Sequence, residues 1–511
     1  MSPMKAQRFF IVALLCLSAA GASLALARRL SQEELLRGAD AYYYALQSEY
    51  FAKTGAVKIP DSSPLHRLTG TLRRMGTSSE GALRLWQAAS LFLFFLAMLA
   101  LARLWSRDLS FPAALLLLYL GLSPSLLFVA IEFPKFFAAL LLLPFWPWPL
   151  NAERKNSGWA WAALPLACLL HRGAVPLAAV FGLAALAVRT QRRFRMGRGF
   201  WLSLAAILLL GLAALFVLPD RFRLMDLQRL AWETPRAGFF SLLSRAQLPL
   251  AVKAELVLIP ILTLGIAWRL WKRQPGRRGI LLPLFSLWLP AFFPFGGEEV
   301  FGVGERYAIL LPTFSLMACL VFLTGEATFP WKKWQLASLA GLALLPIPLA
   351  GPRLEAAHPK SLDPDFAAYR QVSEALADRD IPMLIAHKGL VFYYKYRWMR
   401  EAFPYEPERH WDKTRIWRLA YGITPDEFHY RLSEECGWES ERILRLATPS
   451  YILIREDCWQ GFREKIRRED DTDLYERVWK SPQNPSQHRP AFLYPKHAED
   501  KDDAFPALPK K

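Results

Sequence analysis

The sequence predicts a polytopic α-helical membrane domain that is followed by a smaller mixed α/β domain. About eleven apolar stretches run from residue 9 to about residue 350, and a polar segment of about 160 residues follows them. The core of a bilayer is roughly 30 Å thick and takes about 20 apolar residues per helical crossing. Because helices satisfy their own backbone hydrogen bonds, these stretches indicate membrane-spanning helices.

The composition agrees with this class of protein. Hydrophobic residues make up 53% of the chain, and its net charge is +18. A strongly basic balance can indicate a nucleic-acid partner. Here the basic residues lie in short connectors between apolar runs, where Lys and Arg set the orientation of insertion. We therefore expect these basic residues to interact with the membrane, and we expect no nucleic-acid partner.

The N-terminus is predicted to be cytoplasmic, because Lys5 and Arg8 precede the first apolar run without an acid. Basic connectors then alternate with connectors that carry acids. The predicted exterior connectors are residues 28–81, 132–135, 171–173, 219–249 and 296–306. An odd number of crossings places the C-terminal domain outside the cytoplasm. We expect a multi-pass protein, typical of a bacterial inner membrane.

The predicted domains are residues 1–351, a membrane domain with an exterior loop at 28–81; residues 352–495, an extracytoplasmic α/β domain; and residues 496–511, a disordered tail. Residues 383–386 and 451–454 are strand-like, whereas residues 366–379 are helix-like.

The first apolar run and the two cysteines of the C-terminal segment can each be interpreted in two ways. The first apolar run also fits a signal peptide, although its length favours an uncleaved helix. Cys436 and Cys458 could form a disulfide in an oxidising exterior or remain two thiols.

The first exterior loop contains an acid-led, tyrosine-rich helix. The pattern from residue 41 to 52 is helical, with Tyr43 and Leu46 on one face, and Gly55 is a suitable terminator. Asp40 therefore lies at the start of a helix beside the membrane. Its structural alternative is a helix N-cap. For residues 42–44, three consecutive tyrosines, the alternative to substrate contact by Tyr43 and Tyr44 is an interfacial aromatic belt.

A short first crossing followed by such a helix resembles the glycosyltransferase C (GT-C) superfamily, which includes protein O-mannosyltransferases and aminoarabinose transferases. The resemblance implies that Asp40 lies at the active site. It also implies a polyprenyl-phosphate sugar donor. Oligosaccharyltransferases of this superfamily carry paired acids here that help to hold a divalent metal, whereas Gly38 stands two residues before Asp40 in this chain. The resemblance therefore favours the branch without a metal cofactor.

The second exterior turn holds Glu132 and Lys135 close to the hydrocarbon boundary. Charged groups there are costly unless they are paired, solvated or used. The resemblance implies that Glu132 is a second catalytic acid, because metal-independent members commonly supply one from this turn. Lys135 is a candidate phosphate contact. The alternative for both residues is an ion pair or a lysine that snorkels to the interface.

Two later turns supply further candidates for binding a phosphate. His171 and Arg172 interrupt an apolar stretch, and arginine offers a planar fork of donors that matches phosphate oxygens. The alternative is a solvated hairpin tip. In the glycine-rich turn at 296–307, Arg306 precedes a late helix and resembles the phosphate-facing residue of the superfamily. Glu305 is its expected ion-pair partner.

The loop at residues 219–249 is arginine-rich and fits either a helix lying on the membrane or a loop that closes over a bound lipid.

These candidates combine into one hypothesis of function. A sugar on polyprenyl phosphate is already activated, so an enzyme needs a base for the acceptor and cations for the departing phosphate. We expect an inverting transferase in which Asp40 is the base and Glu132 assists. The acceptor would be a lipid, a glycan or a protein of the cell envelope. The alternatives are a transporter or lipid flippase, and a non-catalytic assembly protein.

Overall fold

The computed structural model describes residues 3–468, except residues 39, 60, 62, 106–108, 151–157, 192–237, 246–247, 274–277, 293–302, 325–330, 360–371, 375, 378–380, 382, 387, 404–409, 422–441 and 446–450. The chain forms two compact units. Unit 1 contains Met1–Gly38 and Pro60–Leu362, and unit 2 contains Ala39–Ile59 and Asp363–Lys511. Residues 39–59 of the predicted exterior loop therefore belong to the same unit as the C-terminal residues. The predicted tail at 496–511 lies outside the described residues.

Unit 1 is helical wherever it has regular structure in the described residues. Its α-helices are α1 (Pro3–Ser31), α3 (Pro64–Arg74), α4 (Ser79–Trp105), α5 (Phe111–Leu120), α6 (Pro124–Glu132), α7 (Pro134–Leu140), α8 (Ala163–Leu170), α9 (Ala174–Gln191), α12 (Gly238–Ser244), α13 (Leu250–Arg273), α14 (Arg278–Ser286), α15 (Val303–Ala308), α16 (Leu311–Leu323), α17 (Lys333–Leu344) and α18 (Ala350–Ala357). Its short 3-10 helices are η1 (Leu143–Phe145), η2 (Trp148–Leu150), η3 (Gly158–Ala162) and η5 (Leu289–Phe292).

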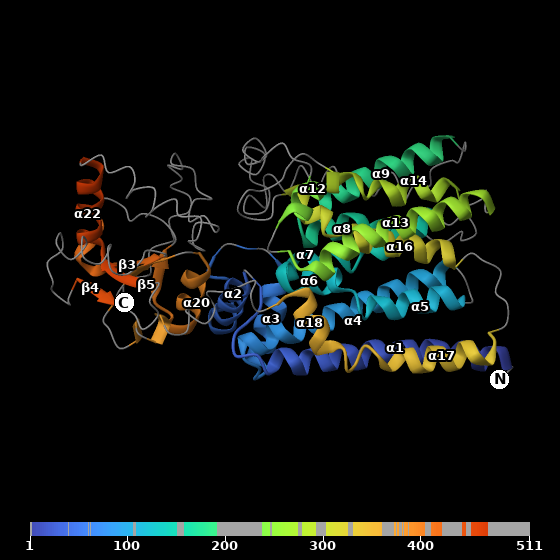
Figure 1. The fold of residues 1–511 in the computed structure, drawn as a ribbon, viewed down its shortest axis with the longest axis horizontal. Helices are drawn as coiled ribbons and strands as arrows, with labels where there is room; N and C mark the ends of the chain where they lie inside the picture. The colour runs from blue at the N-terminus through green and yellow to red at the C-terminus, as the bar shows by residue number, and fades with distance from the viewer. Residues whose placement is uncertain are drawn as a thin grey trace. The chain divides into compact units, whose positions relative to one another are not determined.

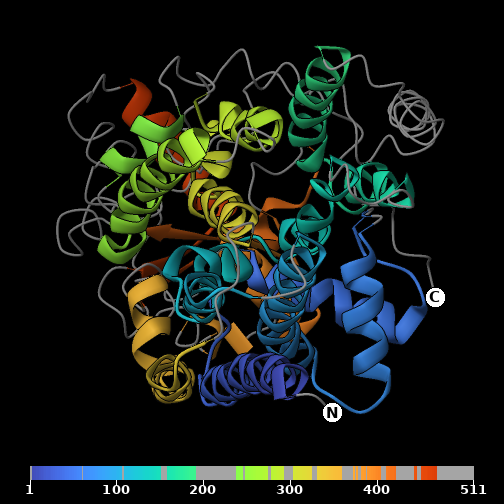
Figure 2. The same cartoon turned by 90° about the vertical axis from the view of Figure 1, so that its right-hand side faces the viewer.

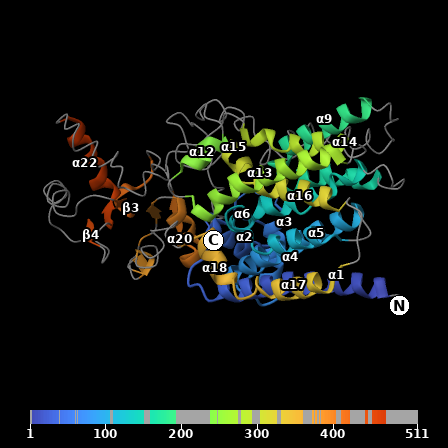
Figure 3. The same cartoon turned by 45° about the vertical axis from the view of Figure 1, so that its right-hand side comes forward.

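The long helices of unit 1 run side by side. Helix α1 packs against α4 and α17, α13 packs against α16, and α9 packs against α14 (Figures 1 and 3). Figure 2 looks along these helices, so that α1 and α17 are seen nearly end-on. Apolar side chains such as Phe94 and Phe137 fill the space between them, with ring centroids 5.7 Å apart. Close van der Waals packing of this kind holds apolar helices together in a bilayer, where burial from water gives no driving force.

Five helical segments in the described residues are long and apolar enough to cross a membrane. They are Ala6–Ser31, Ser79–Trp105, Phe111–Glu132, Leu250–Arg269 and Gly304–Leu323. Shorter apolar helices occupy Ala160–Leu170 and Ala174–Val188. The polytopic helical class is therefore confirmed, whereas the number of eleven crossings stays a prediction. Part of that count falls at residues 192–237, outside the described residues.

Serine residues begin three of the helices in unit 1. The Oγ atoms of Ser63, Ser110 and Ser123 accept hydrogen bonds from backbone N–H groups in the first turns of α3, α5 and α6. A proline follows at the first or second position of each helix, where its missing N–H costs nothing. These Ser and Pro residues fix where the helices start, and therefore where the chain turns.

The apolar segment that contains α5 and α6 is interrupted at residues 121–123. A buried glutamate accepts hydrogen bonds from polar groups at the start of α6. Oε2 of Glu255, on α13, accepts from the backbone N–H of Ser125 at 2.6 Å and from its Oγ at 2.5 Å. The guanidinium of Arg353, on α18, donates to the carbonyl of Ser123 at 3.0 Å. Free backbone groups inside a bilayer are costly, so these contacts hold α6 in place against α13 and α18.

Unit 2 combines helices with one five-stranded sheet, which confirms the predicted mixed α/β class. Its elements are α2 (Ala41–Thr54), β1 (Met383–Ile385), α20 (Lys388–Trp398), β2 (Glu401–Phe403), η7 (Lys413–Arg415), β3 (Ile416–Tyr421), β4 (Ile443–Arg445), β5 (Tyr451–Arg455) and α22 (Glu456–Arg468). The strand order is β2-β1-β3-β5-β4. Strand β1 is parallel to β2 and β3, whereas β5 is antiparallel to β3 and β4.

The predicted strands at 383–386 and 451–454 correspond to β1 and β5. Most of the predicted helix at 366–379 lies outside the described residues. Cys458, in α22, is disulfide-bonded, and Cys436 lies outside the described residues.

Candidate functional site

The turn between α6 and α7 carries two of the predicted site residues. Pro134 is the first residue of α7, and a helix cannot continue smoothly through a proline, so the chain bends at Phe133. Side chains of α4 hold this bend: Gln87 Nε2 donates to the carbonyl of Ile131 at 3.4 Å, and Trp86 Nε1 donates to that of Pro134 at 3.3 Å. The bend therefore presents Glu132 and Lys135 from a fixed backbone.

Gly38 packs against the same bend. Its φ angle is +108°, and a Cβ atom at this position would lie 2.8 Å from the carbonyl oxygen of Ile131. Both the backbone conformation and the close approach therefore require glycine. This explains why an acid does not occupy position 38, where the sequence departs from the paired acids of oligosaccharyltransferases.

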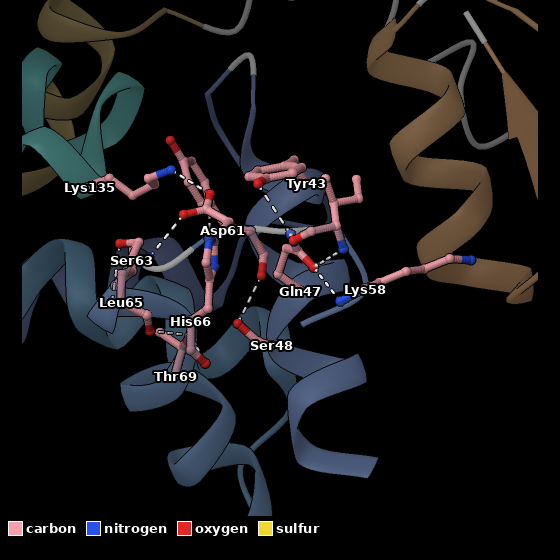
Figure 4. Close-up of polar contacts among 12 residues, drawn as sticks. Tyr43, Gln47, Ser48, Lys58, Asp61, Ser63, Leu65, His66, Thr69 and Lys135 are labelled. Atoms are coloured by element: carbon pink, nitrogen blue, oxygen red, sulfur yellow. Dashed lines mark hydrogen bonds and ion pairs between the residues drawn. The ribbon is translucent and has the colours of Figure 1, made fainter. Parts of the chain in front are cut away.

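Lys135 is bound to an acid that the sequence analysis did not select. Its Nζ donates to Oδ2 of Asp61 at 2.5 Å, and Nε2 of His66 donates to the same oxygen at 3.1 Å (Figure 4). Oδ1 of Asp61 accepts from the backbone N–H of Ser63 at 3.0 Å. Burial alone would raise the pKa of the Asp61 carboxyl, but the hydrogen bond from His66 and the charge of Lys135 hold this pKa well below its ordinary value. Asp61 is therefore a fixed anion.

His171, between α8 and α9, lies among three cations. The pKa of its imidazole is well below the ordinary value, first because burial disfavours its charged form, and then because Lys135, Arg172 and Arg306 are positively charged. The backbone N–H of Gly173 donates to Nδ1 at 3.0 Å. The proton of the neutral ring therefore lies on Nε2, which makes His171 a neutral hydrogen-bond donor.

Aromatic rings hold His171 and Arg306 in place. The ring of Phe136, on α7, lies 5.0 Å from the imidazole, and the guanidinium of Arg306 lies 5.9 Å from the ring centre of Phe133. The hydroxyl of Tyr307 donates to the carbonyl of Gly173 at 3.0 Å. The three turns that precede α7, α9 and α16 are thus linked. Lys135, Arg172 and Arg306 are thus close enough to His171 to act on its charge, and their role as phosphate contacts stays a prediction.

Glu305, which was predicted to pair with Arg306 and to contact substrate, forms an ion pair with Arg245. Its carboxylate forms two bonds of 2.8 Å with the guanidinium of Arg245 and one of 2.6 Å with Oγ of Ser241. The Glu305 side chain is fully buried. Gly238 of α12 also approaches the backbone of Gly304 closely. These contacts dock α12 on α15, so Glu305 supports the backbone that carries Arg306.

Glu132 is nearly buried and bonds to a histidine of α18. Its Oε1 lies 2.5 Å from Nε2 of His358. The carbonyl of His358 accepts from Arg37, whose guanidinium also bonds to Glu33 at 3.0 Å and to Glu355 at 2.5 Å. This chain of contacts joins three parts of unit 1: the end of α6, the segment that follows α1, and helix α18. Glu132 is thus held by its contact with His358, and the ion-pair alternative given for this turn is seen at Lys135, whose ammonium pairs with Asp61.

Asp40 and the tyrosines belong to unit 2. Asp40 occupies the N-cap position of α2 but its side chain makes no capping hydrogen bond, so capping does not explain this acid. Tyr42 and Tyr44 are buried; the ring of Tyr42 lies 4.7 Å from that of Tyr393 on α20, and the ring of Tyr43 lies 5.1 Å from that of Phe392. The tyrosines therefore attach α2 to α20.

Gln47 fixes the chain that leaves α2. Its Oε1 accepts from the backbone N–H groups of Lys58 and Ile59 at 2.9 and 3.1 Å (Figure 4). Its Nε2 donates to the carbonyl of Ile59 at 2.8 Å and to the hydroxyl of Tyr43 at 3.2 Å. The helix itself ends at Gly55, whose φ of +79° confirms the predicted terminator.

The residues missed by the sequence analysis are Asp61, His66, His358 and Arg37. Two of these residues have partners far away in the chain, since Asp61 and Lys135 are 74 positions apart and His358 and Glu132 are 226 positions apart. The local signal was present at Asp61, because an acid two residues before Ser63 and Pro64 is typical of a turn that enters a helix.

Comparison with known proteins defines the class of the fold. No family model matches the sequence, and no curated protein matches it. Among solved structures, the matches belong to the aminoarabinose transferases, one of the groups named in the resemblance that was inferred from the first exterior loop.

The structures in question are those of ArnT from Cupriavidus metallidurans, an aminoarabinose transferase. The ArnT structure bound to undecaprenyl phosphate matches with a TM-score of 0.55 and 13% sequence identity, and the match covers 87% of this chain and 97% of that one. The apo structure of ArnT gives the same TM-score and identity, with 88% and 98% covered. At this identity the two proteins share their fold.

Proposed function

We propose that this protein is an integral membrane glycosyltransferase that moves a sugar from a polyprenyl-phosphate donor to a cell-envelope acceptor on the extracytoplasmic face. The observation that carries the proposal is the group of Lys135, Arg172 and Arg306 around the neutral donor His171. Arginine and lysine are the side chains that bind phosphate oxygens, and a neutral histidine adds a donor. The ArnT fold, with undecaprenyl phosphate bound in one structure, supports this assignment.

In the proposed mechanism the acceptor attacks the anomeric carbon while the sugar–phosphate bond breaks, with inversion. Asp40 takes the acceptor proton, a contribution of roughly 10²- to 10⁴-fold for a general base. The departing polyprenyl phosphate gains negative charge, which the cations of unit 1 stabilise. Tyr43 and Tyr44 keep α2 in place for Asp40. Glu132, bound to His358, fixes the bend that carries Lys135. We propose this positioning role for Glu132 in addition to its role as the second catalytic acid.

We propose that this transfer needs no divalent metal. The described residues contain no group of three His, Cys, Asp or Glu side chains that could hold a metal ion. Position 38 does not accommodate a second acid beside Asp40, because a side chain there would meet the carbonyl of Ile131. Hard cations need several oxygen ligands, and Asp40 supplies one carboxylate.

The proposal is tested with the full-length protein in lipid nanodiscs. Arg306→Gln and Lys135→Met should each weaken the binding of undecaprenyl phosphate at least fivefold, because each removes a cation that the phosphate contacts. Arg67→Gln, at an exposed position of α3, is the matched control and should bind as the wild type does. Unchanged binding in both site variants would refute the phosphate site.

Transfer is measured in membranes with radiolabelled polyprenyl-phosphate sugars. Asp40→Asn should lower transfer by about 10²- to 10⁴-fold while the binding of undecaprenyl phosphate is kept. EDTA should leave transfer unchanged. A flippase or transporter would bind the lipid equally well but would show no transfer in the wild type, which separates that alternative.

A further inference from the structure

The anion Asp61 lies where a bound phosphate would meet it. Oδ2 of Asp61 is 2.5 Å from the ammonium of Lys135, which belongs to the proposed phosphate site. A phosphate oxygen that contacts the same ammonium would therefore lie within about 6 Å of this carboxylate. Two anions at that separation repel each other, so Asp61 and the phosphate compete for Lys135.

Asp61 is also prevented from moving away. The backbone N–H of Ser63 holds Oδ1 at 3.0 Å, and Nε2 of His66 holds Oδ2 at 3.1 Å (Figure 4). The His66 side chain is fully buried, and Ser63 begins α3, so both donors belong to rigid structure. Because both oxygens are held by donors other than Lys135, the carboxylate stays in place when Lys135 turns towards a ligand.

We propose that Asp61, held by Ser63 and His66, is a permanent competitor that limits how tightly the site retains the polyprenyl phosphate released by transfer. The inference rests on the proposed function. The donor is a phosphodiester with one negative charge, whereas the released lipid phosphate carries up to two. A fixed anion therefore disfavours the product more than the donor and promotes product release, a step that limits many enzymes.

The test is the affinity of the full-length protein in nanodiscs for undecaprenyl phosphate. Asp61→Asn keeps an oxygen for the N–H of Ser63 and removes the charge. It should bind undecaprenyl phosphate about tenfold more tightly than the wild type at low salt. Glu80→Gln removes an acid from another ion pair, with Arg84 on α4, so it is the control for loss of a paired carboxylate and should bind as the wild type does.

The charge of the ligand provides a second readout. The second ionisation of a phosphate monoester lies near pH 6, so undecaprenyl phosphate is mainly a monoanion at pH 5 and a dianion at pH 8. The gain from Asp61→Asn should be larger at pH 8, because a dianion is repelled more strongly. A rearranged fold would not produce this dependence. Asp61→Ala, which removes the same charge, should tighten binding by a similar factor and replaces Asp61→Asn if that variant does not fold.

Unchanged or weaker binding by the folded Asp61 variant, or the same gain at both pH values, would overturn the inference. The outcome for Lys135→Met separates this failure from a failure of the proposed function. If Lys135→Met weakens binding but Asp61→Asn does not tighten it, only the competitor role is lost. If Lys135→Met and Arg306→Gln both bind normally, the phosphate site itself is wrong.

Discussion

At the scale of single residues, the state of His171 decides what the proposed phosphate site offers a ligand. Burial and the neighbouring cations lower the pKa of His171 well below its ordinary value, so the ring is neutral at physiological pH. The N–H of Gly173 points at Nδ1 and leaves the ring proton on Nε2. His171 therefore donates a hydrogen bond without adding charge, and the charge comes from the arginines and Lys135.

This tautomer predicts different results for two similar variants. The amide nitrogen of Gln reaches approximately the position of Nε2, whereas that of Asn reaches approximately the position of Nδ1. His171→Gln should therefore bind undecaprenyl phosphate within about threefold of the wild type, and His171→Asn should bind it about tenfold more weakly.

The pH profile of the wild type is the control for the neutral state. Because the pKa of His171 is lowered, His171 should not titrate between pH 6 and 8. The pH dependence of phosphate binding over this range should therefore be the same in the wild type and in His171→Gln. Equal weakening in the Gln and Asn variants would contradict the assigned tautomer.

The charged residues of the proposed phosphate site stand out in the sequence, but their partners do not. Lys135, Arg172 and Arg306 stand out because each interrupts an apolar context at a predicted exterior turn. Asp61 and His358 stand in ordinary polar segments, and only the fold brings them to Lys135 and Glu132. A charge that is costly for its surroundings is visible in a sequence, whereas a contact between distant segments is not.

At the scale of elements, the turns between helices carry the site, and glycine determines how closely they approach. The turn after α1 meets the α6–α7 bend at Gly38, which has a positive φ and lies against Ile131. The helix at 41–54 and its Gly55 terminator followed from local pattern, since capping and periodicity are local. The contact between Gly38 and Ile131 joins segments about 90 residues apart and left no such pattern.

Gly38→Ala should destabilise the protein by roughly 2–4 kcal/mol, because alanine pays for the positive φ and its Cβ meets the carbonyl of Ile131. Gly76 is the matched control: its φ is +104°, and a Cβ there meets nothing within 4 Å. Gly76→Ala should therefore show the cost of φ alone, about 1 kcal/mol. Thermal unfolding in detergent measures both variants, and an equal effect would show that Ile131 imposes no constraint.

At the scale of the whole molecule, the chain builds its second unit from two distant segments. Residues 39–59 leave unit 1 between Gly38 and Pro60 and fold with the C-terminal residues. Within unit 2, Nζ of Lys58 donates to Oε1 of Glu401 at 3.1 Å, and Nζ of Lys395 lies 3.5 Å from Oε2. The acid-led helix α2 is therefore part of the C-terminal fold. Composition divides polar from apolar sequence, so it could not show that a loop joins a domain 300 residues later.

The buried Lys395 makes the stability of unit 2 depend on pH. The pKa of Lys395 is lowered to about 8, mainly because burial disfavours the ammonium; Glu401 opposes this shift and the charge of Lys58 adds to it. In the unfolded chain this pKa is about 10.5, so between pH 8 and 10.5 the unfolded state binds more protons than the folded state. Stability should therefore rise with pH across this window, by on the order of 3 kcal/mol.

Thermal unfolding of the full-length protein from pH 7 to 10.5 checks this sign against two variants. Lys395→Met cannot titrate, so its midpoint should rise less with pH than that of the wild type. Lys53→Met removes an exposed lysine of α2 that pairs with Glu49, and its profile should run parallel to the wild type. Parallel profiles for the wild type and Lys395→Met would mean that the ammonium of Lys395 is not destabilised in the fold. In that case its pair with Glu401 fully offsets the cost of burying the charge.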